Sequence, residues 1–161
     1  MDNYRQFYEK HNARLFYYLL RMTGDYHLAG DIMQESFLRF FEHYRHIEEK
    51  TSLLYTIARN LVFDESRRKK PDKTGVIPEN QSEDCLVESE HQVLIREEYR
   101  QMLGALQQLS SDDREVLALV AGGDCSYREI GRILDISESH VKVKVHRARL
   151  KLKTILNAGG D

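Results

Sequence analysis

Residues 126–153 read SYREIGRILDISESHVKVKVHRARLKLK, and they contain the strongest local signals for structure in the C-terminal half of the chain. Ser126 and Glu129 have the spacing of a capping box, in which both side chains satisfy free backbone N–H groups at the start of a helix. Asp135 interrupts the helical spacing, and Asp is one of the few residues that tolerate the left-handed backbone of a tight turn. Ser137 then suits the N-cap of a second helix. The stretch therefore predicts a short helix, a tight turn and a longer helix.

The second predicted helix separates apolar from cationic side chains. Its apolar residues recur every three or four positions and form one inward stripe, which consists of Val141, Val145, Ala148 and Leu152. Residues 136–156 also contain six Lys or Arg residues and a single acid, Glu138. This is the pattern of a DNA-binding helix-turn-helix, whose second helix enters the major groove while its cations neutralise phosphates. The charge pattern alone leaves a second interpretation open, which is the solvated face of a helical bundle.

Helical spacing extends over most of the remaining chain. The sequence of 161 residues contains nine Gly and two Pro, and we find no alternating pattern that would predict a sheet. Gly24 suits the left-handed cap that ends the first helix, and Asp25 suits the N-cap of the next. Further helical stretches are predicted over about residues 4–22, 26–44, 52–70, 93–106 and 111–121. We therefore expect an all-α fold.

The composition changes in the middle of the chain. Pro71 ends the third predicted helix, because proline disfavours helical geometry in the residue before it. The residues that follow have no long apolar face, and residues 79–98 contain seven acids and one base. We therefore expect two small helical domains, over residues 1–71 and 93–161, joined by a flexible acidic linker over residues 72–92. The C-terminal domain contains the predicted helix-turn-helix.

The overall composition limits the classes of protein. The chain has 24 Lys and Arg residues against 26 Asp and Glu residues, so any basic surface must come from local segregation of charge. No run of apolar residues approaches the ~20 that a membrane-spanning helix needs, and the first residues lack the pattern of a secretory signal. Cys85 and Cys125 are too few for a disulfide framework or a four-cysteine zinc site. We therefore expect a cytoplasmic protein without membrane insertion.

Motifs in both halves of the chain occur together in one family. Residues 28–39 (LAGDIMQESFLR) resemble the D-x-x-Q-E-x-F-L-R signature of the second conserved region of bacterial sigma factors, and residues 57–68 (IARNLVFDESRR) resemble the segment that follows it. In the C-terminal half, residues 114–117, 126–130 and 146–149 resemble the fourth conserved region. The chain is therefore similar to RNA polymerase sigma factors of the extracytoplasmic-function (ECF) group, within the sigma-70 superfamily, over nearly its whole length outside the linker.

One predicted helix face carries acidic and amide side chains with an apolar edge. It consists of Asp31, Gln34, Glu35 and Leu38, whose spacing of three, four and seven positions puts them on the same side. The resemblance implies that this face binds the clamp of the largest subunit of core RNA polymerase, and an ordinary solvated face is the alternative. The paired carboxylates also suggest acid–base or metal chemistry, but no Glu-x-x-His pair of the di-metal bundles lies beside them. We therefore expect no enzyme, no metal site and no cofactor.

The resemblance also implies contacts to promoter DNA in the N-terminal domain. In the family, the loop at about residues 45–51 and the helix after it bind the −10 element, which is the part of the promoter that melts. Asn60 matches the residue that helps to hold a flipped-out base, where hydrogen bonds and stacking offset the cost of unstacking. The cations that suit the phosphates of the separated strand are Arg59, Arg67, Arg68 and Lys69. A solvated basic helix end is the alternative.

In the C-terminal domain, the outer side of the second helix matches family residues that face the −35 element, farther upstream. These residues are Ser139, His140, Lys142, Val143, His146, Arg147 and Arg149. Arg147 can form two hydrogen bonds with a guanine or clamp a phosphate, whereas Lys142 acts more as a point charge. Val143 departs from the small polar residue that is common in the family, which leaves the base preference open.

The resemblance as a whole implies an alternative sigma factor that binds core RNA polymerase through the clamp and the flap of its two largest subunits. Such a factor recognises the −10 and −35 promoter elements and promotes melting and initiation without bond chemistry, and an anti-sigma factor commonly controls it. The acidic linker would pass through positively charged polymerase channels, although an ordinary tether has the same composition. A different class is a stand-alone helix-turn-helix regulator, which would bind duplex DNA tightly as a dimer without polymerase.

Overall fold

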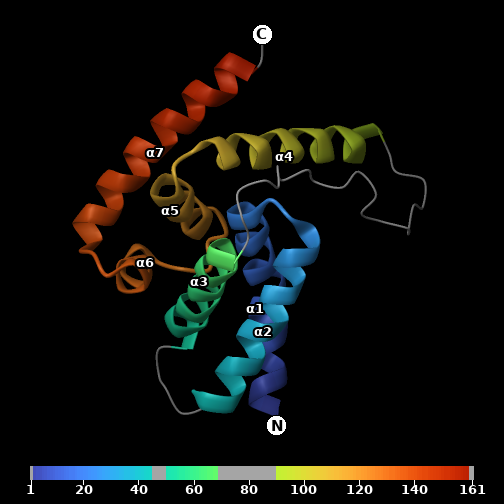
Figure 1. Ribbon diagram of the computed structural model, residues 1–161, viewed down its shortest axis with the longest axis vertical. Helices are drawn as coiled ribbons and strands as arrows, with labels where there is room; N and C mark the ends of the chain where they lie inside the picture. The colour runs from blue at the N-terminus through green and yellow to red at the C-terminus, as the bar shows by residue number, and fades with distance from the viewer. Residues whose placement is uncertain (1, 45–49, 69–89, 160–161) are drawn as a thin grey trace.

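The computed structural model describes residues 2–44, 50–68 and 90–159, and these residues form seven α-helices and no strand (Figure 1). The helices are α1 (Asp2–Thr23), α2 (Tyr26–His43), α3 (Lys50–Arg68), α4 (Glu90–Gln108), α5 (Ser111–Ala121), α6 (Tyr127–Leu134) and α7 (Glu138–Gly159). The predicted all-α fold is confirmed. Lys69, Cys85, most of the predicted linker and most of the loop at residues 45–51 lie outside the described residues. No described helix combines the length and the apolarity needed to cross a bilayer.

Helices α1, α2 and α3 pack together as the N-terminal domain. A left-handed φ of 67° at Gly24 ends α1, and the side chain of Asp25 accepts a hydrogen bond of 3.1 Å from the backbone N–H of Leu28. This turn reverses the chain, so that α2 returns alongside α1 (Figure 1). The aromatic stripe of α2 then packs on α1, where the rings of Phe7 and Phe40 stack with their centroids 4.8 Å apart. The large buried residues of this domain include Leu15, Tyr18, Leu19, Phe37, Phe40, Leu54 and Tyr55.

Helices α4 to α7 form the C-terminal domain, and the predicted helix-turn-helix is confirmed as α6 and α7. The capping box at the start of α6 is complete. The Ser126 hydroxyl accepts a hydrogen bond of 3.1 Å from the backbone N–H of Glu129, and the Glu129 carboxylate accepts one of 2.9 Å from the backbone N–H of Ser126. The amphipathic face that follows buries Ile130 and Ile133. Local sequence therefore fixes where this helix begins and which side faces inward.

The turn between α6 and α7 is tight. Asp135 has a left-handed φ of 57°, as its position in the sequence predicts, and the backbone N–H of Ile136 donates to the carbonyl oxygen of Gly131 at 2.9 Å. The Ser137 hydroxyl then caps α7 by accepting a hydrogen bond of 3.1 Å from the backbone N–H of His140. The predicted apolar stripe of α7 faces the core, with Val141, Val145 and Ala148 fully buried and Leu152 partly buried.

The two domains pack against each other, and no sequence pattern predicted this packing. Helices α4 and α5 contact α1, and α6 contacts α3, so that α5 and α6 lie between α7 and the N-terminal domain (Figure 1). The buried apolar residues of both domains form one continuous cluster. Buried charged or titratable side chains also lie between the domains, and these are His11, Arg21 and Glu115.

We expect Gly131→Ala to lower the free energy of unfolding by about 1–3 kcal/mol, because overpacking strains a close contact. An added Cβ would lie 2.7 Å from the carbonyl oxygen of Ile136, and a backbone atom cannot move aside as a side chain can. Urea unfolding followed by circular dichroism measures the effect. The matched control is Gly104→Ala in α4, where the space around an added Cβ is open. Because Ala has the higher helix propensity, the control should be neutral or stabilising by up to ~1 kcal/mol. Equal losses at both glycines would contradict the close approach at Gly131.

Candidate functional site

The four residues predicted to bind polymerase lie on one side of α2, and we call them the docking face. Asp31 and Gln34 are exposed, Glu35 is half-buried, and Leu38 is 52% exposed. Glu35 accepts a hydrogen bond of 2.9 Å from Nε of Arg39, one turn further along the helix. The docking face therefore offers a protruding apolar side chain within a largely anionic surface, which suits a cationic partner with an apolar pocket.

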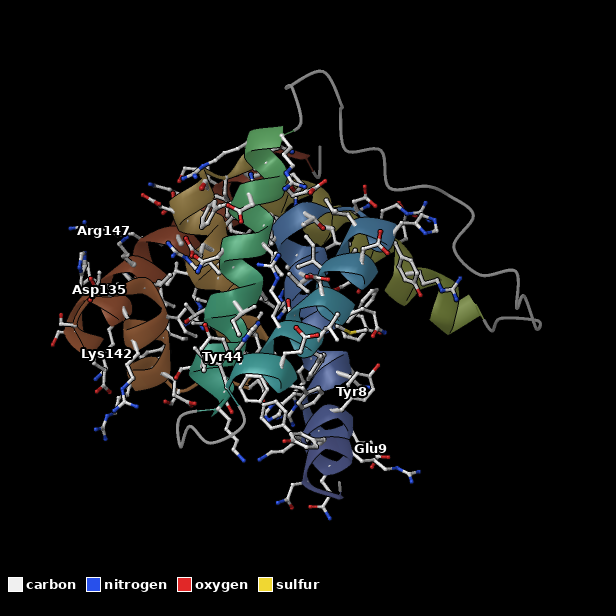
Figure 2. The ribbon with its side chains drawn as sticks, turned by 60° about the horizontal axis from the view of Figure 1, so that its bottom comes forward. Tyr8, Glu9, Tyr44, Asp135, Lys142 and Arg147 are labelled. Carbon is white, nitrogen blue, oxygen red and sulfur yellow. The ribbon has the colours of Figure 1, made fainter. Side chains whose placement is uncertain are left out.

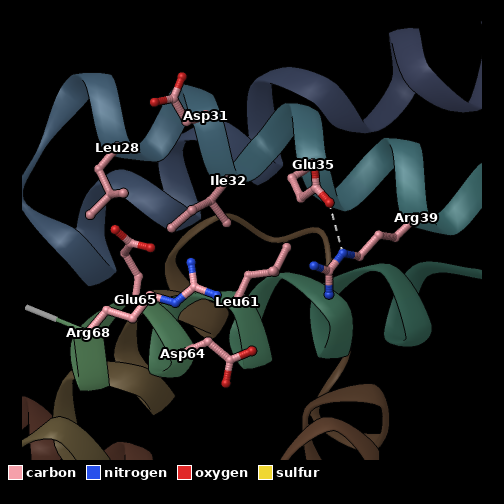
Figure 3. Close-up of a pocket in the computed structure, with 9 residues that line it drawn as sticks. All are labelled: Leu28, Asp31, Ile32, Glu35, Arg39, Leu61, Asp64, Glu65 and Arg68. Atoms are coloured by element: carbon pink, nitrogen blue, oxygen red, sulfur yellow. Dashed lines mark hydrogen bonds and ion pairs between the residues drawn. The ribbon is translucent and has the colours of Figure 1, made fainter.

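An open groove with a volume of about 400 Å³ lies beside the docking face, between α2 and α3 (Figure 3). Its apolar lining residues are Leu28, Ile32 and Leu61. Its charged lining residues are the acids Asp31, Glu35, Asp64 and Glu65 and the cations Arg39 and Arg68. Asp64 and Glu65 extend the anionic surface from α2 onto α3, and neither was predicted to bind a partner. The sequence held a signal for a role of Asp64, because this residue is the acid of the motif at residues 57–68.

The residues predicted to contact the separated promoter strand lie on α3, apart from Lys69, which is outside the described residues. Those exposed to solvent are Asn60, Arg67 and Arg68. Arg59 differs from them, since its Nε donates to the carboxylate of Glu115 on α5 in an ion pair. Its guanidinium also lies over the ring of Phe63, 4.9 Å from the ring centroid. Three of these side chains are therefore accessible to solvent, whereas Arg59 forms an ion pair with the C-terminal domain.

The exposed side of α7 carries every residue predicted to face the −35 element. These exposed residues are Ser139, His140, Lys142, Val143, His146, Arg147 and Arg149. Figure 2 shows Lys142 and Arg147 at the outer edge of the helix-turn-helix. Val143 is 44% exposed, and Leu150, which was not predicted, is 55% exposed on the same side, seven positions later. The cations therefore flank an apolar strip of the kind that contacts thymine methyl groups.

One cation of α7 is engaged within the domain. Nζ of Lys151 donates a hydrogen bond of 2.9 Å to the carboxylate of Asp113 on α5. Burial alone would raise the pKa of Asp113, but hydrogen bonds from Lys151 and Ser110 outweigh it and lower that pKa. Lys151 therefore anchors α7 to α5 and contributes less to the cationic face.

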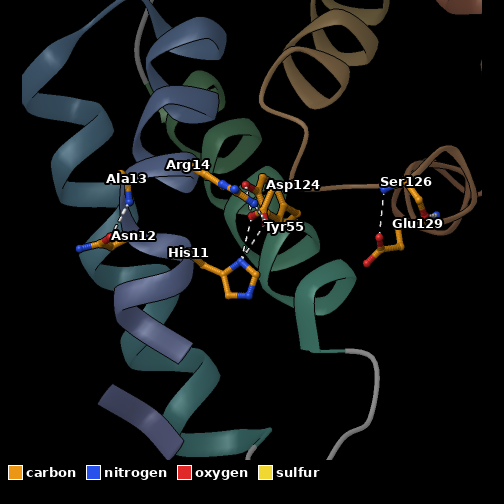
Figure 4. A network of polar contacts seen from close by, with 8 residues as sticks. All are labelled: His11, Asn12, Ala13, Arg14, Tyr55, Asp124, Ser126 and Glu129. Atoms are coloured by element: carbon orange, nitrogen blue, oxygen red, sulfur yellow. Dashed lines mark hydrogen bonds and ion pairs between the residues drawn. The ribbon is translucent and has the colours of Figure 1, made fainter. Parts of the chain in front are cut away.

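A buried carboxylate lies where the two domains meet (Figure 4). The side chain of Asp124, in the turn after α5, is 4% exposed. It accepts hydrogen bonds of 2.9 Å from Nδ1 of His11, 2.7 Å from the hydroxyl of Tyr55 and 3.3 Å from Nη1 of Arg14. Burial alone would raise the pKa of Asp124, but the hydrogen bonds from His11 and Tyr55 bring it below its ordinary value. An ionised carboxylate therefore links α1 and α3 to the turn that leads into α6.

Cys125, next in the chain, is a buried free thiol. Burial raises the pKa of this thiol, and the neighbouring Asp124 raises it further. A thiol with a raised pKa is a poor nucleophile and reacts slowly with oxidants. Among the described residues, no three potential metal ligands lie close together.

Two family regions match the chain. Sigma-70 region 2 matches residues 7–71, which contain the docking face and the residues of α3 that were predicted to contact the promoter strand. Sigma-70 region 4 matches residues 99–152, which contain the helix-turn-helix.

Two solved structures share the fold over nearly the whole chain. The sigma factor RpoE from Bartonella quintana, in complex with the anti-sigma factor NepR, gives a TM-score of 0.71 at 22% identity and covers 98% of both chains. CnrH in complex with the cytosolic domain of CnrY gives a TM-score of 0.71 at 20% identity, covering 96% of this chain and 88% of CnrH.

Relatives by sequence are closer. The ECF RNA polymerase sigma factor SigM of Bacillus subtilis is 32% identical over 163 residues, which cover 96% of this chain and 95% of SigM. The ECF RNA polymerase sigma factor SigL of Mycobacterium tuberculosis is 32% identical over 167 residues, which cover 97% of this chain and 90% of SigL. With both sigma-70 regions present in order and this identity over almost its full length, the chain belongs to the ECF sigma factors of bacterial RNA polymerase.

Proposed function

We propose that this chain is an alternative sigma factor that docks on core RNA polymerase, recognises two promoter elements with its two domains and promotes strand separation. The observation that carries the proposal is the segregation of charge onto separate helix faces. The N-terminal domain exposes the anionic docking face on α2, and the C-terminal domain exposes a cationic face on α7. The first suits a cationic protein surface and the second suits phosphates. Each step is a binding event, so the proposal requires no catalytic residue and no cofactor.

The docking face is proposed to bind the clamp of the largest polymerase subunit. Leu38 would become buried as an apolar anchor, and Asp31 and Glu35 would pair with cations around it. Asp64 and Glu65 extend this anionic surface along the groove. The flap of the second-largest subunit is proposed to bind the C-terminal domain.

Promoter recognition is divided between two helices in this proposal. The N-terminal half of α7 enters the major groove at the −35 element, where Arg147 contacts a base edge or a phosphate and Lys142 neutralises a phosphate. On α3, Asn60 hydrogen-bonds a base of the −10 element that has left the stack. Arg67, Arg68 and Lys69 hold the phosphates of that strand, and Arg59 joins them when it is free of Glu115.

Control by an anti-sigma factor is part of the proposal. RpoE of Bartonella quintana was solved in complex with the anti-sigma factor NepR, and CnrH in complex with the cytosolic domain of CnrY. This chain shares their fold, and we extend to it the binding of an inhibitory protein partner. The proposed place of action is the cytoplasm, where the polymerase works.

Mixing the purified chain with core RNA polymerase and a promoter library should produce initiation at a defined set of promoters, identified by sequencing the transcripts. The chain alone should bind duplex DNA weakly, because in this proposal it recognises promoter elements only when it is docked on core polymerase. Failure to form a complex with core polymerase would contradict the proposal. Tight binding of duplex operator DNA by a dimer of the isolated chain would point instead to a stand-alone regulator.

Glu35→Lys should weaken binding to core polymerase by at least about tenfold, which corresponds to ~1.4 kcal/mol. The substitution places a cation in the anionic docking face, where it repels the cationic partner surface and loses the ion pair with Arg39. Fluorescence anisotropy of the labelled chain titrated with core polymerase measures the affinity. Glu9→Lys, at an exposed position of α1, makes the same change in net charge and also loses an ion pair with an arginine one turn away, so it should leave the affinity unchanged. If both variants bind as the parent chain does, the docking face is assigned wrongly.

Arg147→Ala should reduce use of the −35 element and lower the slope of log affinity against log salt concentration by ~1, as expected for one lost phosphate contact. If Arg147 reads a guanine instead, specificity at that base falls by about 1–3 kcal/mol. Binding of the polymerase complex to promoter fragments over a range of salt concentrations separates the two cases. Arg5→Ala removes an equal charge from α1, far along the chain from α7, and serves as the control. An Arg147→Ala complex with the parent salt slope and the parent specificity would exclude a DNA contact there.

A further inference from the structure

Buried polar contacts join the two domains, and the contact at Asp124 depends entirely on the other domain. Within the described part of the chain, its three side-chain donors, His11, Arg14 and Tyr55, all belong to α1 and α3 (Figure 4). A carboxylate that is 4% exposed is stable only while such donors are present. When the domains part, Asp124 returns to water at the surface of its own domain, and the contact is lost as a unit.

A second contact connects helix ends of the two domains. Nε and Nη2 of Arg21 both donate to the carbonyl oxygen of Ala118, at 3.2 and 2.9 Å. This carbonyl lies in the last turn of α5, where carbonyl groups lack donors within the helix and a cation is favourable. Gly122 gives the guanidinium room, since a Cβ there would lie 3.0 Å from Nη2. A hydrogen bond in the opposite direction joins α4 to α1, because Nε2 of Gln107 donates to the carbonyl oxygen of Arg21 at 3.0 Å.

The third contact engages Arg59, which the proposed function assigns to the promoter strand. Its partner Glu115 is 4% exposed, and the Arg59 side chain is 27% exposed. The ring of Phe63 holds the guanidinium from α3, while Glu115 approaches it from α5. Asn60, the next residue, stays exposed. The domain interface therefore covers one group of the strand-binding surface and leaves its neighbour open.

A strand phosphate and the Glu115 carboxylate require the same donors. Both are anions that bind a guanidinium through short, charge-assisted hydrogen bonds, so Arg59 cannot serve both in full at once. The carboxylate is already desolvated beside Arg59, and it would also repel a phosphate that approached the pair. This interface combines these polar contacts with apolar ones, and domains of one chain move relative to each other unless their interface is large and hydrophobic.

We propose that the packed arrangement of the two domains is a self-inhibited state, in which Glu115 occupies Arg59 and withholds it from single-stranded promoter DNA. Asp124 stabilises this state and thereby sets the fraction of chains that are open. The inference rests on the proposed function at one point, the assignment of Arg59 to the strand. The apparent strand affinity is then the intrinsic affinity multiplied by the open fraction. Any partner that binds the open chain more tightly than the closed chain increases strand binding.

The test uses the intact chain and two isosteric variants, Asp124→Asn and Glu115→Gln. Small-angle X-ray scattering measures the radius of gyration, and fluorescence anisotropy measures the affinity for a labelled single-stranded DNA of mixed sequence. Both variants should have a larger radius of gyration than the parent chain. Both should bind the single-stranded DNA more tightly than the parent chain does. The gain in affinity should be about equal to the ratio of closed to open chains in the parent protein, so a ratio of about ten gives a gain of about tenfold. Circular dichroism should report the same helix content in all three proteins.

Two further variants separate the interface from a general effect of charge. Asp135→Asn removes the same charge from an exposed residue of the same domain, and Asn tolerates the left-handed backbone at that position. It should change neither the radius of gyration nor the strand affinity. Arg59→Ala combined with Asp124→Asn should keep the expanded shape and lose the gain in affinity.

The outcomes distinguish the inference from the function on which it rests. A parent chain that is already expanded, or variants that stay as compact as the parent, would overturn self-inhibition. Expansion without a gain in strand affinity would also overturn it, provided that Arg59→Ala weakens strand binding in the open chain. If Arg59→Ala has no effect on strand binding in the open chain, competition for Arg59 is overturned together with its assignment to the strand, while polymerase docking and −35 recognition are untouched.

Discussion

A buried carboxylate that draws its hydrogen bonds from another domain is the constraint on which the arrangement of this molecule depends. The burial of the Asp124 carboxylate is stable only while the donors on α1 and α3 form hydrogen bonds with it. Those two helices are themselves fixed to each other by the stacked rings of Tyr18 and Tyr55, whose centroids are 5.1 Å apart. Because the turn that carries Asp124 runs directly into α6, these partners help to fix the position of the helix-turn-helix on the N-terminal domain, together with the contacts of Arg21 and Arg59.

Features with local causes could be predicted from the sequence. The capping box of Ser126 and Glu129 and the left-handed turn at Asp135 each depend on atoms within about one helical turn, and all of these are present in the structure. The inward stripe of α7 follows from spacing alone. The roles given to the docking face and to the outer side of α7 came from the resemblance, since spacing places residues on a face without naming what binds there.

The packing of the domains could not be predicted in the same way, because its partners are far apart in the chain. His11 and Asp124 are separated by 113 positions, and Arg59 and Glu115 by 56. Sequence patterns place isolated charged residues in solvent, which is correct for most of them. His11 carried a signal of burial, since it lies in the apolar stripe of α1, but periodicity does not identify a partner. For Arg59 the family motif indicated DNA, and the structure adds a carboxylate that reaches the same guanidinium.

The end of α5 links the packing of the domains to the stiffness of the recognition unit. The last turn of α5 contains no basic residue. The cation that interacts with its carbonyl groups is Arg21, which belongs to the other domain. After the domains separate, only water remains for those carbonyl groups, and the backbone between α5 and α6 loses a fixed point. Amide protons at the base of the helix-turn-helix would then exchange faster with deuterium, so opening of the chain would also loosen the segment that leads into α6 and α7.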